Sequence, residues 1–126
     1  MTGVVKVKPG VRFDTIAPAG FAILSALYLA SASLGSPLTI TSGTDGEHSG
    51  PADPHHSGEA YDVRSQDFAE VMRPTVLSSI MHSLGLQQPG STSTEIFTEQ
   101  FYGFIEDAGT TNEHIHVQLR KGHVYG

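Results

Sequence analysis

The sequence predicts an α+β fold in a single domain, residues 1–126. Helix-like and strand-like segments follow one another without the regular alternation that is typical of a doubly wound sheet. A length of 126 residues gives room for one continuous core and not for a second independent domain. Apolar and charged residues make up 38% and 16% of the chain, which is ordinary for a globular protein.

The first 41 residues predict a strand, a helix and a second strand. Residues 4–11 alternate in part, which indicates an edge strand or an extended arm. Pro18 suits the first turn of a helix that runs to about Leu34, where a glycine follows. Residues 37–41 are rich in β-branched side chains and predict a strand. The helix is expected to lay an apolar face on the core, formed by Phe21, Leu24, Leu27 and Tyr28.

Residues 16–34 can also be interpreted as a secretory signal segment. They follow three basic residues and end in an Ala-Ser-Ala that resembles a signal-peptidase site. Asp14 and Pro18 interrupt the approach, and the apolar run is too short and too polar for a membrane span. We therefore favour a core helix.

The middle of the chain predicts a polar loop, a strand and an interrupted helix. Residues 43–54 hold hardly any apolar side chain, which is typical of a loop. Residues 60–64 predict a short strand, and Ser65 suits the N-cap of a helix that begins at the next residue. Pro74 must kink or restart this helix, whose second piece is expected over residues 75–84. The expected apolar face of the first piece consists of Phe68, Val71 and Met72.

The last third of the chain predicts strands. After a flexible connection at residues 87–93, the aromatic-rich residues 94–105 predict a strand or a hairpin. Residues 114–119 alternate strictly and predict the final strand.

Two clusters of potential metal ligands stand out. His55 and Asp62 frame the pattern His-x-x-Gly-x-Ala-x-Asp, in which a loop ligand and a strand ligand can converge on one ion. The second cluster is Glu-His-Ile-His at residues 113–116, whose two histidines share one face of the final strand. His55, Asp62 and His116 form a two-His, one-carboxylate set, which suits zinc with a fourth position left for water. The chain has no cysteine, so a thiolate site is excluded.

These clusters supply the parts of a hydrolytic site. Zinc would lower the pKa of its bound water and polarise a scissile carbonyl. Glu113 is expected to move the water proton to the leaving amine, and His114 to donate a hydrogen bond to the oxyanion. A His-x-His pair on a strand is also often an ordinary surface pair, but two clusters that complete one site favour the metal. The other histidines are expected to be exposed or structural: His48, His56, His82 and His123.

The motifs resemble the family of zinc D-alanyl-D-alanine carboxypeptidases, D,D-dipeptidases and phage L-alanyl-D-glutamate endopeptidases, whose fold is shared by the hedgehog signalling domain. The resemblance runs from about residue 38 to residue 119. It implies a small, largely antiparallel sheet that carries zinc, with helices packed on one side, and peptidoglycan stem peptides as substrates. The family signature, Ser-x-His-x-x-Gly-x-Ala-x-Asp followed by Glu-x-x-His or His-x-His, maps onto His55, Gly58, Ala60, Asp62, Glu113, His114 and His116.

The sequence departs from the family's pattern at two places. Asp53 stands where the family has its serine, and Thr44-Asp45 stand where the family usually has an arginine that binds or polarises the substrate. Arg64, on the metal-facing side of its strand, is a candidate to bind substrate in place of that arginine, and Lys121 is another.

The sequence leaves two main functions open. One is a zinc peptidase that acts on peptides with D-amino acids; the other is a catalytically silent zinc module that supports structure or partner binding, as in the hedgehog branch. A calcium loop would rest on Asp45, Glu47 and Asp53, whose spacing matches no dedicated calcium loop. A net charge of −6 with scattered Lys and Arg argues against nucleic acid and anionic membranes. We expect cytoplasmic synthesis without a signal peptide, and action at the bacterial cell wall.

Overall fold

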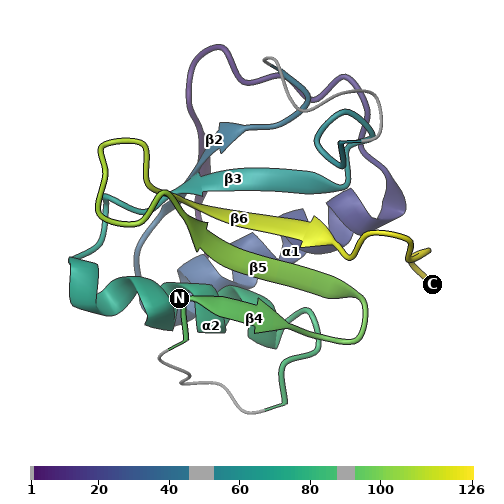
Figure 1. The fold of residues 1–126 in the computed structure, drawn as a ribbon. Coiled ribbons are helices and arrows are strands. Elements are labelled where there is room, and N and C mark those ends of the chain that lie inside the picture. Colours follow the sequence, from purple (N-terminus) through teal and green to yellow (C-terminus); the bar gives the residue numbers. More distant parts are fainter. Residues whose placement is uncertain (1, 46–52, 88–92) are drawn as a thin grey trace.

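The computed structural model describes residues 2–45, 53–87 and 93–126. These residues form six strands, two α-helices and one short 3-10 helix, η1 (Figure 1). The helical elements are α1 (Pro18–Leu34), η1 (Glu70–Met72) and α2 (Arg73–His82). The strands are β1 (Val5–Val7), β2 (Leu38–Ser42), β3 (Ala60–Arg64), β4 (Glu95–Phe97), β5 (Phe101–Glu106) and β6 (His114–Leu119).

The six strands make one mixed sheet in the order β1-β2-β3-β6-β5-β4. Only the edge pair β1–β2 is parallel, and the other four pairs are antiparallel. Both helices lie behind this sheet in Figure 1, so one of its faces is covered by helices and the other is not. The predicted α+β class and the largely antiparallel sheet are confirmed.

Strand alternation divides β3 and β6 between the two faces of the sheet. Successive side chains of a strand point to opposite faces, so every second residue turns towards the helices. The residues that do so are fully buried: Tyr61, Val63, Ile115 and Val117. The residues between them, which include Asp62, His114 and His116, lie on the face away from the helices. The candidate ligands therefore stand on the open face.

Helix α1 has the predicted bounds, and as predicted Leu27 is fully buried and Leu24 packs against the core, but the rest of its buried face differs from the prediction. Gly35 ends it in the left-handed conformation, with a φ of 67°. Phe21 and Tyr28, which were expected in the core, are 60% and 45% exposed. The helix instead turns an alanine-rich stripe to the sheet, because small side chains let the two layers approach closely. This buried stripe consists of Ala19, Ile23, Ala26, Leu27 and Ala30.

The helix predicted directly after Ser65 does not form. Ser65 is fully buried and is not an N-cap, and its hydroxyl donates to the backbone carbonyl of Glu113 at 3.2 Å. Helix α2 begins only at Arg73, because Pro74 is accommodated in a first helical turn and not in a helix interior. The expected apolar face of the first piece is therefore wrong as well, and Val71 is 83% exposed.

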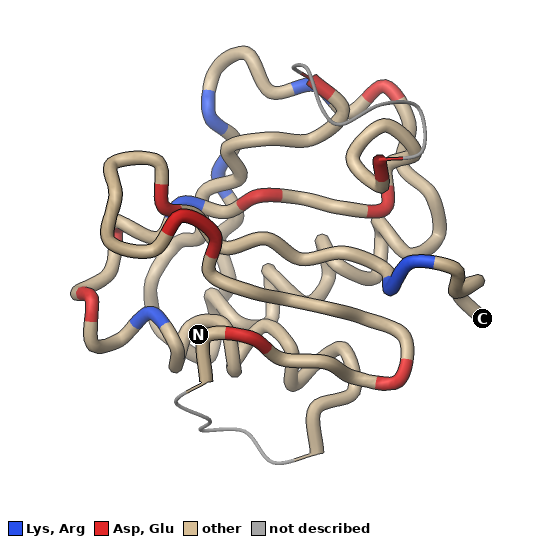
Figure 2. Tube along the Cα trace, viewed as in Figure 1, with Lys and Arg blue, Asp and Glu red and all other residues tan. Residues whose placement is uncertain are grey.

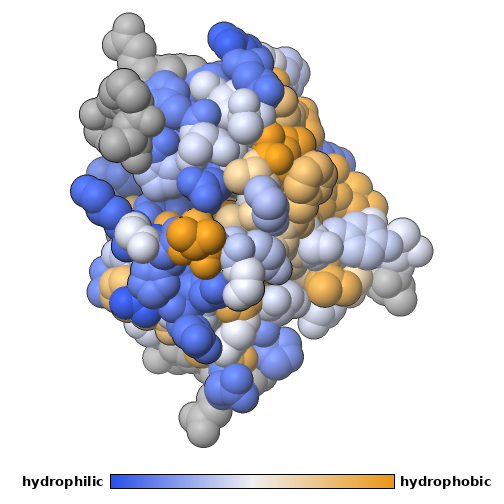
Figure 3. Space-filling model, turned by 90° about the vertical axis from the view of Figure 1, so that its right-hand side faces the viewer, coloured by the Kyte–Doolittle hydropathy of each residue, from blue (hydrophilic) through white to orange (hydrophobic). Residues whose placement is uncertain are grey.

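The remaining strand predictions are confirmed, and the predicted strand or hairpin at residues 94–105 is the β4–β5 hairpin, which ends at Glu106. Parts of the predicted loop 43–54 and connection 87–93 lie outside the described residues. Figure 3 shows apolar side chains gathered on the flank that holds the helices, whereas the sheet flank is largely hydrophilic. Among the described residues, no helix has the length and apolar character needed to cross a membrane.

Candidate metal centre

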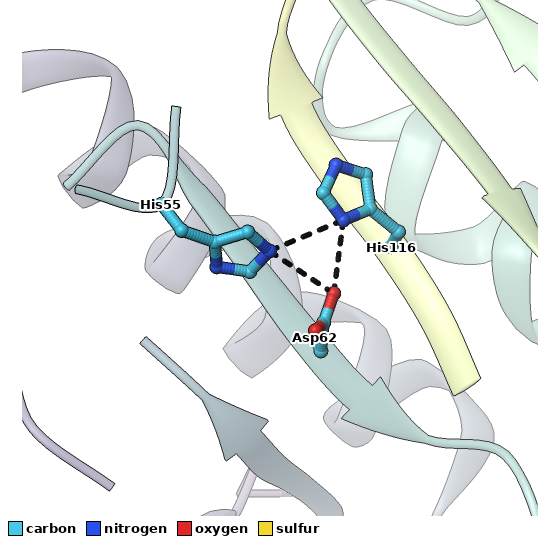
Figure 4. Close-up of side chains that lie close together, drawn as sticks. All are labelled: His55, Asp62 and His116. Carbon is cyan, nitrogen blue, oxygen red and sulfur yellow. Dashed lines mark hydrogen bonds and ion pairs between the residues drawn. The ribbon is translucent and has the colours of Figure 1, made fainter. Parts of the chain in front are cut away.

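Three elements bring the predicted ligands together. Asp62 on β3 and His116 on β6 are directly opposite each other in the antiparallel register, at the centre of the sheet. His55 lies on the turn that leads into β3, and its side chain is almost fully buried. Figure 4 shows the two rings and the carboxylate pointing at one another.

Gly58 explains how the His55 turn reaches the sheet. Its φ is 71°, a conformation that L side chains rarely adopt. A Cβ on Gly58 would lie 2.0 Å from the carbonyl oxygen of Thr15, and a Cβ on Gly20 of α1 would lie 2.1 Å from the Gly58 carbonyl oxygen. The turn is thus pressed against the start of α1 on both sides. Two glycines fix the position of His55.

The ligand atoms form a tight triangle. His116 Nδ1 lies 2.9 Å from Asp62 Oδ1, and His55 Nε2 lies 3.3 Å from both of these atoms. The Asp62 side chain is 14% exposed. Zinc bonds of about 2.0–2.1 Å at tetrahedral angles place ligand atoms roughly 3.3–3.4 Å apart. The buried His55, Asp62 and His116 therefore lie close enough together to bind one metal ion.

Hydrogen bonds on the far side of each ring set the tautomers. His55 Nδ1 donates to the carbonyl oxygen of Gly43 at 3.0 Å, which leaves Nε2 as the lone-pair atom of the neutral ring. His116 Nε2 donates to Gln118 Oε1 at 2.8 Å, which leaves Nδ1 for the site. Gln118 is itself oriented, because its Nε2 donates to the Leu119 carbonyl at 3.1 Å. When both rings are neutral, His55 Nε2 and His116 Nδ1 present lone pairs beside the Asp62 carboxylate, and a cation bound there would satisfy all three atoms.

The charges of the site agree with this arrangement. Burial by itself would raise the pKa of Asp62, but hydrogen bonds to His116 and His55 and the charges of His55 and His114 outweigh it and lower that pKa. Burial disfavours the charged form of His55, yet the hydrogen bond and charge of Asp62 raise its pKa. The carboxylate stays ionised, as a metal ligand must be.

His114 and Glu106 form a second cluster beside the triad. His114 Nε2 lies 2.9 Å from Glu106 Oε1 and 3.6 Å from Asp62 Oδ1, while its Nδ1 donates to the Asn112 carbonyl at 2.9 Å. Burial lowers the pKa of His114, but Asp62, Asn112 and Glu106 together raise it. Both ring nitrogens face acceptors, so His114 is a hydrogen-bond donor at the edge of the triad. The sequence did not single out Glu106, which becomes visible only through its register opposite His114.

Glu113 is not part of this site. It precedes β6, and its carboxylate accepts hydrogen bonds from Arg73 at 2.7 Å, from the Gly109 N–H at 3.1 Å and from the Ser65 hydroxyl. The side chain is 4% exposed. Burial would raise its pKa, but the partners outweigh burial and lower it. The expected placement of Glu113 beside the metal is therefore not observed, because the residue turns towards the start of α2 and ties it to β6.

A groove of about 750 Å³ runs along the triad. Its walls include Glu106, His114 and Gln118, and its far end is formed by Arg120 and Lys121 after β6. Lys121 is thus at the groove, as one of the two substrate-binding candidates. The other candidate, Arg64, is not; it lies on the same face of the sheet but lines a separate pocket with Lys6 and Lys8.

Among the remaining predicted residues that the structure describes, His123 and Asp53 line the groove, whereas His56, His82 and Asp45 do not. His56, His82 and His123 are exposed, as expected, and His48 lies outside the described residues. Of the calcium-loop candidates, Asp45 accepts the backbone N–H groups of Arg12 and Gly43, and Asp53 accepts that of His55. Glu47 lies outside the described residues.

Comparisons of the chain with protein-family models, curated proteins and solved structures find no match. The resemblance to the zinc peptidases and to the hedgehog fold therefore stays a prediction that rests on the motif residues. Their arrangement in space is independent of that resemblance. It consists of a buried triad, preset tautomers and a groove on the open face of the sheet.

Proposed function

We propose that the chain is a zinc-dependent peptidase that cleaves peptidoglycan stem peptides. The observation that carries the proposal is the convergence of His55 Nε2, Asp62 Oδ1 and His116 Nδ1 in the wall of a groove. Two histidines and one carboxylate are a ligand set that zinc uses when its fourth position serves catalysis. The motif resemblance supports peptides with D-amino acids as the substrate class.

The roles of the residues follow from their positions. His55, Asp62 and His116 would hold the zinc, which would supply an activated water and polarise the scissile carbonyl. His114 stands next to the triad, so we assign to it the hydrogen bond to the developing oxyanion. Glu113 is too firmly held elsewhere to act as the acid/base. Glu106, which contacts His114 and lines the groove, takes that role in the proposal.

A catalytically silent metal module is the second candidate. The position of Glu113 favours it, because the residue that the motif assigns to proton transfer is bound to Arg73 instead. In that case the metal would hold the His55 turn, β3 and β6 together. Zinc binding alone does not separate the two functions, whereas hydrolysis does.

The test is incubation of the zinc-loaded chain with a stem pentapeptide that contains both the L-Ala-D-Glu and the D-Ala-D-Ala bond. We expect one cleaved product by mass spectrometry, and its identity assigns the bond. Cleavage should disappear with a chelator and in His116→Ala, but persist in His82→Ala, which removes an exposed histidine outside the site. Full zinc occupancy without cleavage would refute the peptidase and leave the silent module.

A further inference from the structure

Basic side chains gather at one place in an otherwise acidic chain. The sequence has seven Lys and Arg against thirteen Asp and Glu. Three of the seven, Lys6, Lys8 and Arg64, line one pocket of about 410 Å³. Figure 2 shows blue segments close together at the upper left, where β1 runs and β3 ends. Among the described residues, Asp67 is the pocket's only acidic lining residue.

Strand register places these side chains in a row. Lys6 on β1 is opposite Thr39 on β2. Ile40 is opposite Val63 in the antiparallel β2–β3 pair, so Thr39 faces Arg64. Neighbouring strands lie about 4.8 Å apart, so Lys6, Thr39 and Arg64 form a short line across three strands on the open face. Thr39, in the middle of this line, is only 8% exposed.

Protection of the sheet edge does not account for this arrangement. Lysines on an edge strand such as β1 discourage pairing with another chain. Protection of the edge by the lysines of β1 requires neither Arg64, which lies two strands further into the sheet, nor Thr39 on the strand between them. Arg64 has an ion pair with Asp67 at 4.0 Å, and both side chains are more than a third exposed. Such a pair is weak, so it leaves the guanidinium able to bind a ligand.

We propose that this pocket is an anion-binding site for a carboxylate or phosphate group. Ammonium, hydroxyl and guanidinium groups are the donors that bind such groups, and the guanidinium can bind two oxygens at once. The site goes beyond the proposed peptidase function and does not depend on it. Arg64 follows Asp62 by two residues on the same strand face, so the pocket begins roughly 7 Å along β3 from the metal centre.

The test uses backbone amide NMR with inorganic phosphate and, in a second arm, acetate, at constant ionic strength. We expect saturable shifts confined to residues around Lys6, Thr39 and Arg64. Arg64→Gln should weaken the affinity about tenfold, which corresponds to the loss of one charge-assisted hydrogen bond. Arg12→Gln, which removes an exposed cation that is paired with Asp14 and lines neither pocket, should leave the affinity unchanged. The stronger of the two arms identifies the ligand group.

Two results would overturn the proposal. One is linear, non-saturating shifts with both anions, which indicate screening alone. The other is an equal loss of affinity in Arg64→Gln and Arg12→Gln, which would mean that only the net charge of the protein matters. Zinc occupancy is measured on the same samples, so failure of the metal centre and failure of this pocket are told apart.

Discussion

Gln118 is expected to control metal affinity without touching the metal. In the wild type its Oε1 accepts the Nε2 proton of His116, which keeps Nδ1 free as a ligand atom. The substitution Gln118→Met keeps a similar volume but removes the acceptor. The neutral His116 ring can then carry its proton on Nδ1, where Asp62 Oδ1 lies 2.9 Å away. Zinc must displace that proton before it binds.

The expected loss follows from the hydrogen bond that zinc would have to break. A hydrogen bond to a charged carboxylate contributes about 1.5–3 kcal/mol, which corresponds to roughly a 10- to 150-fold weaker zinc affinity. Loss of outer-sphere partners of metal ligands has effects of about this size. Gln118→Glu is the matched control, because it retains an acceptor and should bind zinc at least as tightly as the wild type.

The assay is a competition titration with a chromogenic zinc chelator on wild type and both variants. Nitrogen chemical shifts of the His116 ring in the metal-free protein report the tautomer directly, and thermal melts check the fold. If Gln118→Met binds zinc as tightly as the wild type, or keeps the Nε2–H tautomer, then Gln118 does not set the ligand atom.

Three further predictions concern the frame of the site. Glu113→Gln should lower the free energy of unfolding in urea by about 1.5–3 kcal/mol, because Arg73 loses its charged partner, while zinc content stays unchanged; loss of zinc would place Glu113 back at the metal. The pKa of Glu113 is lower in the folded protein than in the unfolded chain. The Glu113 carboxylate therefore contributes fully to the free energy of unfolding above the unfolded pKa of about 4.3, and this contribution is lost as pH falls through the folded pKa. The stability difference between wild type and Glu113→Gln should therefore shrink below about pH 4.3, and a constant difference down to pH 2 would contradict this. Gly58→Ala should lower the free energy of unfolding by about 1–3 kcal/mol, because the position has a positive φ and the added Cβ would meet the Thr15 carbonyl. The substitution should also weaken zinc binding, because it displaces the turn that holds His55. An unchanged melting temperature would show that the turn adapts to the alanine.

The sequence predicted the strands and the ligand triad well because both depend on local signals. Residues 60–64 and 114–119 have the alternation of strands, and their predicted bounds agree with β3 and β6. Once two such strands are neighbours, Asp62 and His116 can lie opposite each other. The motif spacing between His55 and Asp62 contains the glycine that the turn requires.

The errors arose where tertiary contacts decide between local alternatives. Helix α1 is apolar on more than one side, so periodicity alone could not choose the alanine-rich stripe over the face with Phe21 and Tyr28. Two of the three partners of Glu113, Ser65 and Arg73, come from distant parts of the chain, and the spacing between Glu113 and His116 says nothing about them. Gln118 and Glu106 have no sequence signal of their own. They acquire a role only through the rings that they contact.

The most direct measurement is the zinc content of the purified chain beside His55→Ala, His116→Ala and the control His82→Ala. We predict about one zinc per chain in the wild type and in His82→Ala, as expected for a single two-His, one-carboxylate site. Both triad variants should lose it while remaining folded by circular dichroism. A wild-type chain that holds no zinc even after reconstitution would contradict the metal centre, and the peptidase would fall with it.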